Sequence, residues 1–457
     1  MRNEISAFVF IYGIGFVNGQ VVAAQPVEQL DQLQQIIEQQ QRQLEVQRRQ
    51  IQVLERKMHR LEQTTETLEP AVAGAHPKTD QTDAEKAPEL IRQATQRLEE
   101  NASLPSYTKV TVRPERYKIS IGANLNRQIT VGADGNQTKT YFTDSSNIPT
   151  NVFLKGSAKV NRDLTLSTRV EYALQDNAAI AVSQKNERAG FRTSGRFFEV
   201  IADSTSWGKA SFGKGFASSF GIIEIDFSGT YYANLLSVGN SAGGLLFYSG
   251  DTNTYTNFSV GSAFLDQESL SLINRVRYDS PSWNGIQLSG TTGEDQYTDG
   301  AVRFKQSLAG FDLSSIVTYQ DNPNGALSDW RFAGGAGILH RSTGYNLTIG
   351  GSRAKAKTDG RKSEGFIARA GKRHNWFNIG ETKTTVDYTR SEDITTRGDV
   401  ATSYGFFLVQ DIDKFGLQLY TGYRKYNLDR DDIKLDDIDI VTFGMAVNFS
   451  VDISPDP

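Results

Sequence analysis

The stretch RVRYDSPSWNG, residues 275–285, decides the fold class. Arg275 and Arg277 are two residues apart, so both side chains point to the same face of an extended strand. Val276 and Tyr278 point to the opposite face. The SPSWNG segment that ends the stretch combines Ser, Pro, Asn and Gly, which are typical of a tight turn. The stretch therefore predicts a strand with one charged and one apolar face, followed by a turn into a second strand.

The same alternation with period 2 runs through the rest of the chain from about residue 107. A soluble β-sandwich would also alternate, but here the polar face carries Arg, Lys, Glu and Gly, and Tyr, Phe and Trp cluster at the strand ends. That combination is typical of a transmembrane β-barrel. The sequence predicts about sixteen antiparallel strands, at 117–130, 150–160, 164–176, 189–202, 207–215, 270–279, 285–293, 299–308, 310–321, 329–341, 343–355, 364–374, 380–391, 400–412, 415–427 and 437–449.

The composition excludes several classes of function. The chain has 457 residues, with 49 Lys and Arg against 53 Asp and Glu, so it lacks the basic surplus of a nucleic-acid-binding protein. It contains no cysteine, which excludes disulfide scaffolds, cysteine zinc sites and thiol catalysis. We find no metal-binding or nucleotide-binding motif and expect no cofactor. The acidic stretch 429–439 lacks the glycine and the spacing of a calcium loop, so we interpret it as a solvated loop.

The residues before the barrel predict three further regions. An apolar core at 7–17 and the small residues Val22-Ala23-Ala24 are typical of an export signal. Apolar residues then recur every seven positions and predict a coiled coil rather than a solvated charged helix: Leu30, Ile37, Leu44, Ile51 and Met58. The predicted organisation is a signal peptide at 1–24, a coiled coil at 25–69, a linker with a short helix at 70–106 and a barrel domain at 107–457.

One connection differs from the others. About 55 residues, 216–269, separate the fifth and sixth predicted strands, which is long for a loop without a function. Its apolar residues predict that it packs inside the barrel. It carries the carboxylates Glu224 and Asp226, which would face basic residues that strand parity places on the inner wall. These predicted pore-wall residues are Arg169, Arg275, Arg277, Arg303, Lys305, Arg331, Arg369 and Arg424. Reversing the charge of Arg275 and Arg277 is expected to change ion selectivity with little effect on stability.

Several segments together resemble Gram-negative general porins. They are RVRYDSPSWNG (275–285), GSAKVNRDLTLSTRVEY (156–172), WGKASFGKG (207–215), YGFFLVQDIDKFGLQLYTGYRKYNLD (404–429) and VTFGMAVNF (441–449). The coiled coil resembles the extensions of some sugar- and anion-specific porins. The resemblance implies a trimer of sixteen-stranded barrels whose third loop folds into each pore. Such porins usually end on an aromatic residue, whereas eight residues follow Phe449 here, so either Phe449 serves internally or the last strand runs further.

The sequence therefore predicts a passive diffusion channel for small hydrophilic solutes and ions, with a weak preference for anions. It would lie as a homotrimer in the lipopolysaccharide-containing outer membrane, with the coiled coil in the periplasm and without a nucleic-acid partner. A structural tether or adhesin with a plugged barrel is the alternative. A barrel hydrolase is the weakest hypothesis, because His340 and His374 lack evident Ser or Asp partners in the sequence nearby.

Overall fold

The computed structural model describes residues 117–266, 272–322, 324 and 328–454. The predicted signal peptide, coiled coil and linker lie outside the described residues. Within the described ranges, no helix is both long and apolar enough to cross a membrane.

Seventeen strands form one antiparallel sheet, and two more form a separate hairpin. The sheet contains β1 (Tyr117–Ala133), β2 (Thr138–Asp144), β3 (Asn151–Lys159), β4 (Leu164–Asp176), β5 (Phe191–Ser204), β6 (Gly208–Phe216), β9 (Leu272–Asp279), β10 (Ile286–Gly293), β11 (Thr298–Leu308), β12 (Phe311–Asp321), β13 (Ser328–His340), β14 (Tyr345–Ala356), β15 (Lys362–Phe377), β16 (Gly380–Glu392), β17 (Val400–Ile412), β18 (Leu417–Asp429) and β19 (Ile438–Ile453). The hairpin is β7 (Leu246–Ser249) and β8 (Thr254–Ser259).

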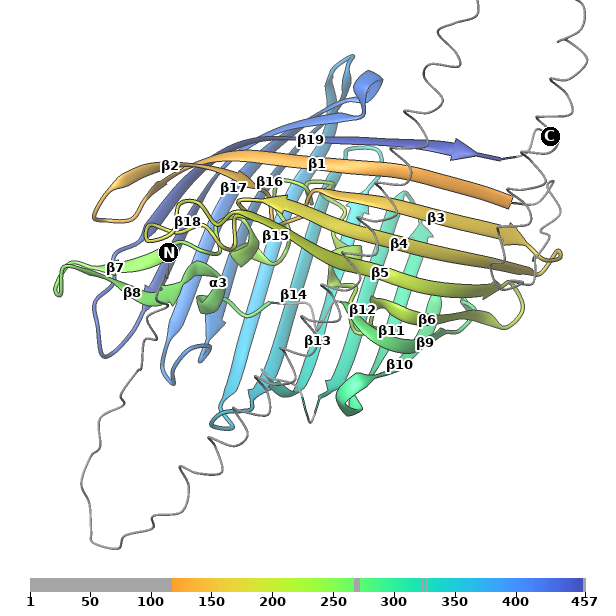
Figure 1. Ribbon diagram of the computed structural model, residues 1–457, viewed down its shortest axis with the longest axis horizontal. Coiled ribbons are helices and arrows are strands. Elements are labelled where there is room, and N and C mark those ends of the chain that lie inside the picture. Colours follow the sequence, from red (N-terminus) through yellow and green to blue (C-terminus); the bar gives the residue numbers. More distant parts are fainter. Residues whose placement is uncertain (1–116, 267–271, 323, 325–327, 455–457) are drawn as a thin grey trace, which may run out of the picture. The chain divides into compact units, whose positions relative to one another are not determined.

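The sheet closes into a barrel because its first and last strands pair. The β1–β19 register runs from Ile119 opposite Ile453 to Ala133 opposite Asp439, and Figure 1 shows the two strands side by side. β3 pairs with the first half of β1 and β2 with the second half, so β2 and β3 together count as one strand of the barrel. The barrel is thus sixteen-stranded, as predicted. The prediction missed β2, whose seven residues it assigned to a loop.

Side chains alternate between an apolar outer face and a polar inner face. On β9, Val276 and Tyr278 point outward and are 49% and 46% exposed. Arg275 directly precedes Val276 on the strand, so its side chain points inward, and it is 6% exposed. Because one residue of slip would exchange the two faces, this alternation fixes the register of the whole wall.

The connections alternate in length around the barrel. Short turns join β3 to β4 and β13 to β14, whereas longer segments join β4 to β5 and β18 to β19. The last strand continues to Ile453, so Phe449 lies within β19 and points outward with an exposed ring. Of the two alternatives for the chain end, the structure therefore favours the longer strand.

The connection between β6 and β9 has secondary structure of its own, and we call it the inserted segment (217–271, described to 266). It contains the β7–β8 hairpin, the 3-10 helices η2 (Ile222–Ile225) and η3 (Val238–Asn240), and the helix α3 (Val260–Ala263). The remaining 3-10 turns are η4 (Glu294–Gln296) and η5 (Asp413–Phe415), both between strands of the wall.

Candidate functional site inside the barrel

The inserted segment packs against the inner wall through an apolar cluster. Its own side chains in this cluster are Ile222, Ile225, Leu236, Val238, Leu245, Phe247, Val260 and Phe264. The wall contributes Tyr141, Ile316, Ile367, Tyr426, Leu428, Ile438 and Ile440. These wall residues come from β2, β12, β15, β18 and β19, so the apolar cluster lies against the part of the wall that runs from β12 through β19 to β2. The predicted packing inside the barrel is confirmed.

Glycines on the inner face of β13 give the segment its room. A Cβ at Gly337 would overlap the backbone carbonyl of Ile225, and a Cβ at Gly335 would lie 2.5 Å from the Ile225 side chain. Thr348 on β14 donates to the same Ile225 carbonyl at 3.5 Å. The glycine-rich sequence of β13 therefore allows the backbone of η2 to lie directly against the wall.

A buried ion network holds the segment directly after η2, through Asp226. Arg369 contacts Asp226 at 2.6 Å and Asp387 at 3.3 Å, and Arg424 contacts Asp387 at 2.7 Å. The amide of Asn234 donates to Asp387 at 2.6 Å and its oxygen accepts from Arg424 at 2.9 Å. The four charged side chains are at most 5% exposed. Two positive and two negative charges balance, so Asp226 belongs to an anchor between the segment and the wall.

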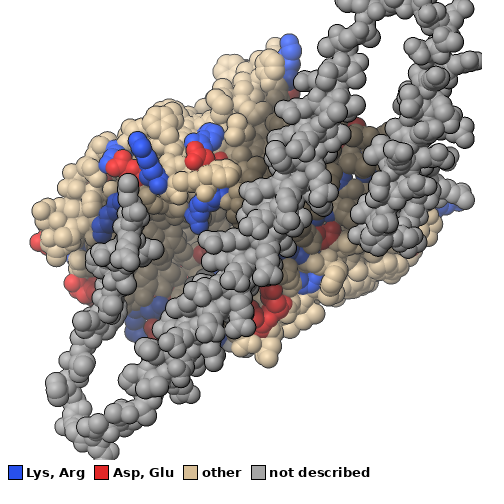
Figure 2. Space-filling model, viewed as in Figure 1, with Lys and Arg blue, Asp and Glu red and all other residues tan. Residues whose placement is uncertain are grey.

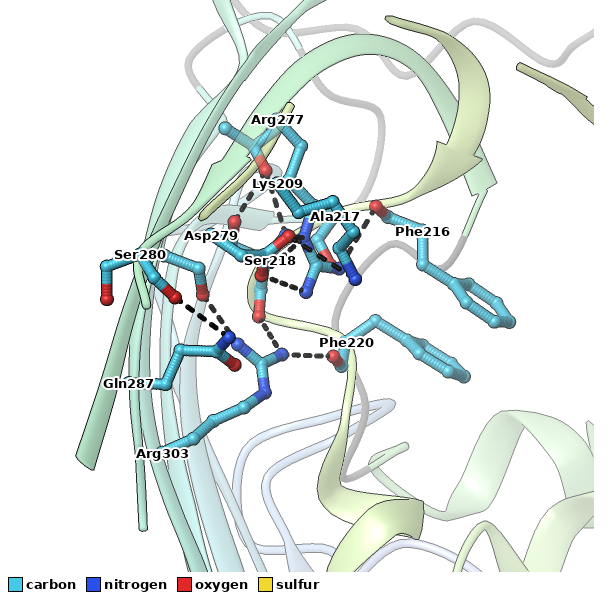
Figure 3. A network of polar contacts seen from close by, with 12 residues as sticks. Lys209, Phe216, Ala217, Ser218, Phe220, Arg277, Asp279, Ser280, Gln287 and Arg303 are labelled. Atoms are coloured by element: carbon cyan, nitrogen blue, oxygen red, sulfur yellow. Dashed lines mark hydrogen bonds and ion pairs between the residues drawn. The ribbon is translucent and has the colours of Figure 1, made fainter. Parts of the chain in front are cut away.

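Arg275 and Arg277 bind the backbone at the end of β6 and at the start of the inserted segment. Arg275 pairs with Glu199 at 2.6 Å and donates to the Phe216 carbonyl at 3.0 Å. Arg277 pairs with Asp279 at 2.6 Å and donates to the Ala217 carbonyl at 2.9 Å, as Figure 3 shows. The side chains of the Arg275–Glu199 pair are only 3% and 6% exposed. The expectation that charge reversal here would leave stability nearly unchanged is therefore at odds with the contacts, because a carboxylate at 275 would face a carboxylate and a carbonyl.

Arg303 and Asp299 on β11 also bind the backbone at the start of the inserted segment. Arg303 donates to the carbonyls of Ser218 at 2.6 Å and Phe220 at 2.8 Å (Figure 3). Asp299 accepts from the backbone amides of Ser218 at 3.2 Å and Ser219 at 2.7 Å. One strand thus supplies a cation for the carbonyls and an anion for the amides, which fixes the backbone of 218–220.

Two of the predicted residues meet in a more open position. Lys305 contacts Glu224 at 2.9 Å, with side chains 57% and 43% exposed. In Figure 2 basic and acidic side chains lie next to each other on the visible face, and most of the remaining surface carries neither charge. Arg331 donates to the carbonyl of Asp266 at 2.9 Å. Glu224 and Lys305 therefore differ from the buried anchors in facing solvent.

A second partly exposed cluster lies on β4 and β5. Glu171 accepts from Arg169 at 2.6 Å and from Arg196 at 2.7 Å, and it is almost fully buried. The Arg169 and Arg196 side chains remain 30% and 21% exposed. Arg169 also lies over the Phe197 ring, 3.4 Å from its centroid. Lys155 is paired with Arg169 in the register of β3 and β4, so the cluster has a positive surplus.

Strand parity places all eight predicted basic residues on the inner face, but the structure divides them by environment. Arg277, Arg303, Arg369 and Arg424 anchor the inserted segment, Arg275 is buried against β5 and β6, and Arg169 and Lys305 are partly exposed. Asp279, Asp299 and Arg196 were not predicted as partners. The first two share the parity of Arg277 and Arg303 on their own strands, so parity alone could have found them; Arg196 lies at a bulge that no pattern indicates.

Comparison with known proteins supports the fold. No protein-family model matches the chain. No curated protein matches it either. Among solved structures, an anion-selective porin from Comamonas acidovorans has a TM-score of 0.51 at 13% identity, covering 73% of this chain and all of that one. OmpF of Salmonella typhi has a TM-score of 0.47 at 14% identity, and covers 74% of this chain and 98% of its own.

The outer-membrane channel DcaP of Acinetobacter baumannii has a TM-score of 0.47 at 10% identity and covers 73% of this chain and 98% of its own. Of these three, the Comamonas protein is the one whose similarity is high enough to compare folds. The described part of the chain therefore has the fold of outer-membrane porins: a closed antiparallel barrel of sixteen strands with a segment folded inside.

Proposed function

We propose that this protein is a passive diffusion channel for small hydrophilic solutes and ions. The observation that carries the proposal is the placement of partly exposed charges on the inside of a closed barrel whose outside is apolar. Arg169, Arg196, Lys305 and Glu224 face inward and keep between 21% and 57% of their side chains exposed. Charged groups at these positions need water around them, which a solute path would provide.

The outer face supports insertion in a membrane. Exposed aliphatic and aromatic side chains recur on the outward positions, among them Val276, Leu288, Val302, Val317 and Phe366. A basic side chain facing lipid near the midplane would cost about 2–4 kcal/mol. We therefore place the barrel in the outer membrane of a Gram-negative bacterium, in contact with lipopolysaccharide, and infer a homotrimer with the N-terminal coiled coil in the periplasm.

A modest preference for anions follows from the partly exposed charges. Lys155, Arg169 and Arg196 surround Glu171, and the nearby Glu199 is already paired with Arg275, so a positive surplus remains; Lys305 and Glu224 neutralise each other. A local positive surplus raises the concentration of anions in a confined aqueous path. The effect is screened over about 8 Å at physiological ionic strength, so the preference is weak.

The alternative is a plugged barrel that serves as a tether or adhesin. It is favoured by the apolar cluster between the inserted segment and the wall, since a folded core inside the barrel reduces the space left for solutes. The two functions predict opposite results in any measurement of flux.

A hydrolase is not favoured, although His340 does have a serine partner, contrary to the expectation from the sequence. Its Nε2 lies 3.2 Å from the Ser342 hydroxyl and its Nδ1 lies 2.8 Å from the Thr343 hydroxyl. Both ring nitrogens are thus engaged by hydroxyls, which leaves neither for the carboxylate that orients a catalytic histidine.

Flux into liposomes tests the channel function. Liposomes containing the full-length protein are diluted into isotonic solutions of small sugars or amino acids, and the swelling rate is measured. We expect swelling that slows as the solute grows. Swelling no faster than that of protein-free liposomes, for every solute, would favour the plugged barrel.

A further inference from the structure

Three phenylalanine rings form a continuous row inside the barrel, and we call it the aromatic row (Phe197, Phe216 and Phe220). Phe197 on β5 meets Phe216 edge-on, with ring centroids 4.9 Å apart. Phe216 and Phe220 are stacked, with centroids 3.8 Å apart and planes 9° apart. Phe197 is buried, whereas the stacked pair stays partly exposed. The row therefore presents partly exposed apolar ring surface near the charged side chains of β4 and β5.

The backbones beneath the stacked pair are fixed independently of the rings. Arg275 and Arg277 hold the carbonyls of Phe216 and Ala217, and Arg303 holds the carbonyl of Phe220. Figure 3 shows the rings of Phe216 and Phe220 pointing away from Arg277 and Arg303. The backbone positions from which both rings project are thus fixed by hydrogen bonds, so the stack is already formed before a solute arrives.

Positive charge lies at the other end of the row. The guanidinium of Arg169 is 3.4 Å from the centroid of Phe197, and Arg196 lies 5.9 Å from the same centroid. Both arginines share Glu171, which leaves the group with a positive surplus. An aromatic surface beside unbalanced cations fits a solute that has both a flat apolar face and an anionic substituent.

We propose that the aromatic row is a solute-binding subsite for planar ring-containing acids. This inference rests on the proposed channel function and adds a preference within it. The ring of the solute packs on the exposed surface of the Phe216–Phe220 stack, and the positive surplus at Arg169 and Arg196, beyond Phe197, attracts its acidic group through space without a direct contact. A solute of equal charge without a ring has only the electrostatic attraction and binds more weakly.

Block of the chloride current in a planar bilayer tests the subsite. The full-length protein is titrated with benzoate, with propionate as an acid without a ring, and with cyclohexanecarboxylate as an acid whose ring is not planar. We expect benzoate to block at the lowest concentration. Phe220→Leu retains apolar volume but removes the flat face, and it should raise the half-blocking concentration of benzoate about 2- to 10-fold while leaving that of propionate unchanged.

The control is Phe212→Leu on the outer face of β6, where the ring is 69% exposed. It should leave all three half-blocking concentrations unchanged. Equal block by benzoate and cyclohexanecarboxylate in the unmodified protein, or an unchanged response in Phe220→Leu, would overturn the subsite while leaving the channel intact. A complete lack of chloride current would instead refute the channel function. Should Phe220→Leu fail to fold, the comparison of the three acids on the unmodified protein decides.

Discussion

At the scale of single residues, Asp387 is the carboxylate on which the buried network depends. It pairs with Arg369 and Arg424 and accepts from Asn234, with no exposed side-chain surface. Asp387→Asn leaves two guanidinium groups facing Asp226 alone. Since breaking a buried ion pair strands an uncompensated charge, we expect a loss of about 3–5 kcal/mol in the free energy of unfolding, measured by urea titration in detergent.

The matched control is Arg390→Gln, which breaks an exposed pair with Glu392 on the outer side of the same strand. Exposed pairs contribute about 0–1 kcal/mol, so the control should unfold nearly as the unmodified protein does. Equal losses in the two variants would mean that the network is not an anchor.

Lys305 and Glu224 form the exposed pair through which selectivity can be tuned with little structural cost. Lys305→Gln removes a positive charge and should shift the permeability ratio toward cations by about twofold, and Glu224→Gln should shift it toward anions by a similar factor. The measurement is the reversal potential in a salt gradient. Shifts in the same direction, or none, would place the pair outside the ion path.

The contribution of the turn between β3 and β4 to folding stability depends on pH through Asp163. Hydroxyl donation from Thr205, followed by donation from Ser204 and Ser206, holds the pKa of Asp163 below its usual range. Since the folded pKa is depressed, the stabilisation is present above about pH 4 and is lost as the pH falls toward the folded value. We expect acid to lower the urea midpoint more in the unmodified protein than in Asp163→Asn; parallel acid losses would contradict this role.

The sequence predicted which side chains face the inside of the barrel, but not how deeply each of them is buried. Alternation alone places Arg275 and Arg277 inward, because a period of two leaves no other choice. Their burial depends on partners from elsewhere in the chain: Glu199 of β5 and the Phe216 carbonyl of β6 for Arg275, and the Ala217 carbonyl of the inserted segment for Arg277. Alternation does not indicate which groups these side chains meet, so it predicts only that they lie on the inner wall.

At the scale of elements, β13 and η2 depend on one glycine. Gly337→Ala would push a methyl group into the Ile225 carbonyl and displace η2, weakening the Asp226–Arg369 contact. Overpacking of this kind costs about 1–3 kcal/mol. Because the chain has no cysteine, Glu224→Cys provides a single labelling site, and we expect Gly337→Ala to speed its reaction with a thiol reagent.

Gly300→Ala is the matched control for that experiment. Gly300 lies on an outward position of β11, and its Cβ would have a nearest neighbour at 3.6 Å, so labelling of Glu224→Cys should be unaffected. If both alanine variants, or neither of them, change the labelling rate, the close approach of η2 to β13 does not position the segment.

The strands of the wall were predictable as elements because each alternates over eight or more residues. β2 and the β7–β8 hairpin were missed because all three strands are short. β7 has four residues, β8 six and β2 seven, too few for alternation to be distinguished from a loop. β2 also follows β1 through a turn that lies inside a polar stretch. Short strands of this kind are defined by their partners rather than by their own sequence.

At the scale of the whole molecule, closure by β1 and β19 creates an inside, and the inserted segment packs within it. The partly exposed charges lie on β4, β5 and β11, whereas the apolar cluster lies mainly against β12 to β19. We assign solute passage to the side of the partly exposed charges, where β9 and β11 also hold the start of the segment through Arg277 and Arg303. The number of strands was predictable from the sequence, whereas this asymmetry required the folded structure.

Single-channel conductance of the full-length protein in a planar bilayer tests the central claim most directly. We predict discrete current steps at the first insertion in symmetrical potassium chloride, with a reversal potential in a salt gradient that indicates a weak preference for chloride. Insertion without current steps, in protein whose barrel is shown to be folded by its heat-dependent migration on a gel, would contradict the channel and support the plugged barrel.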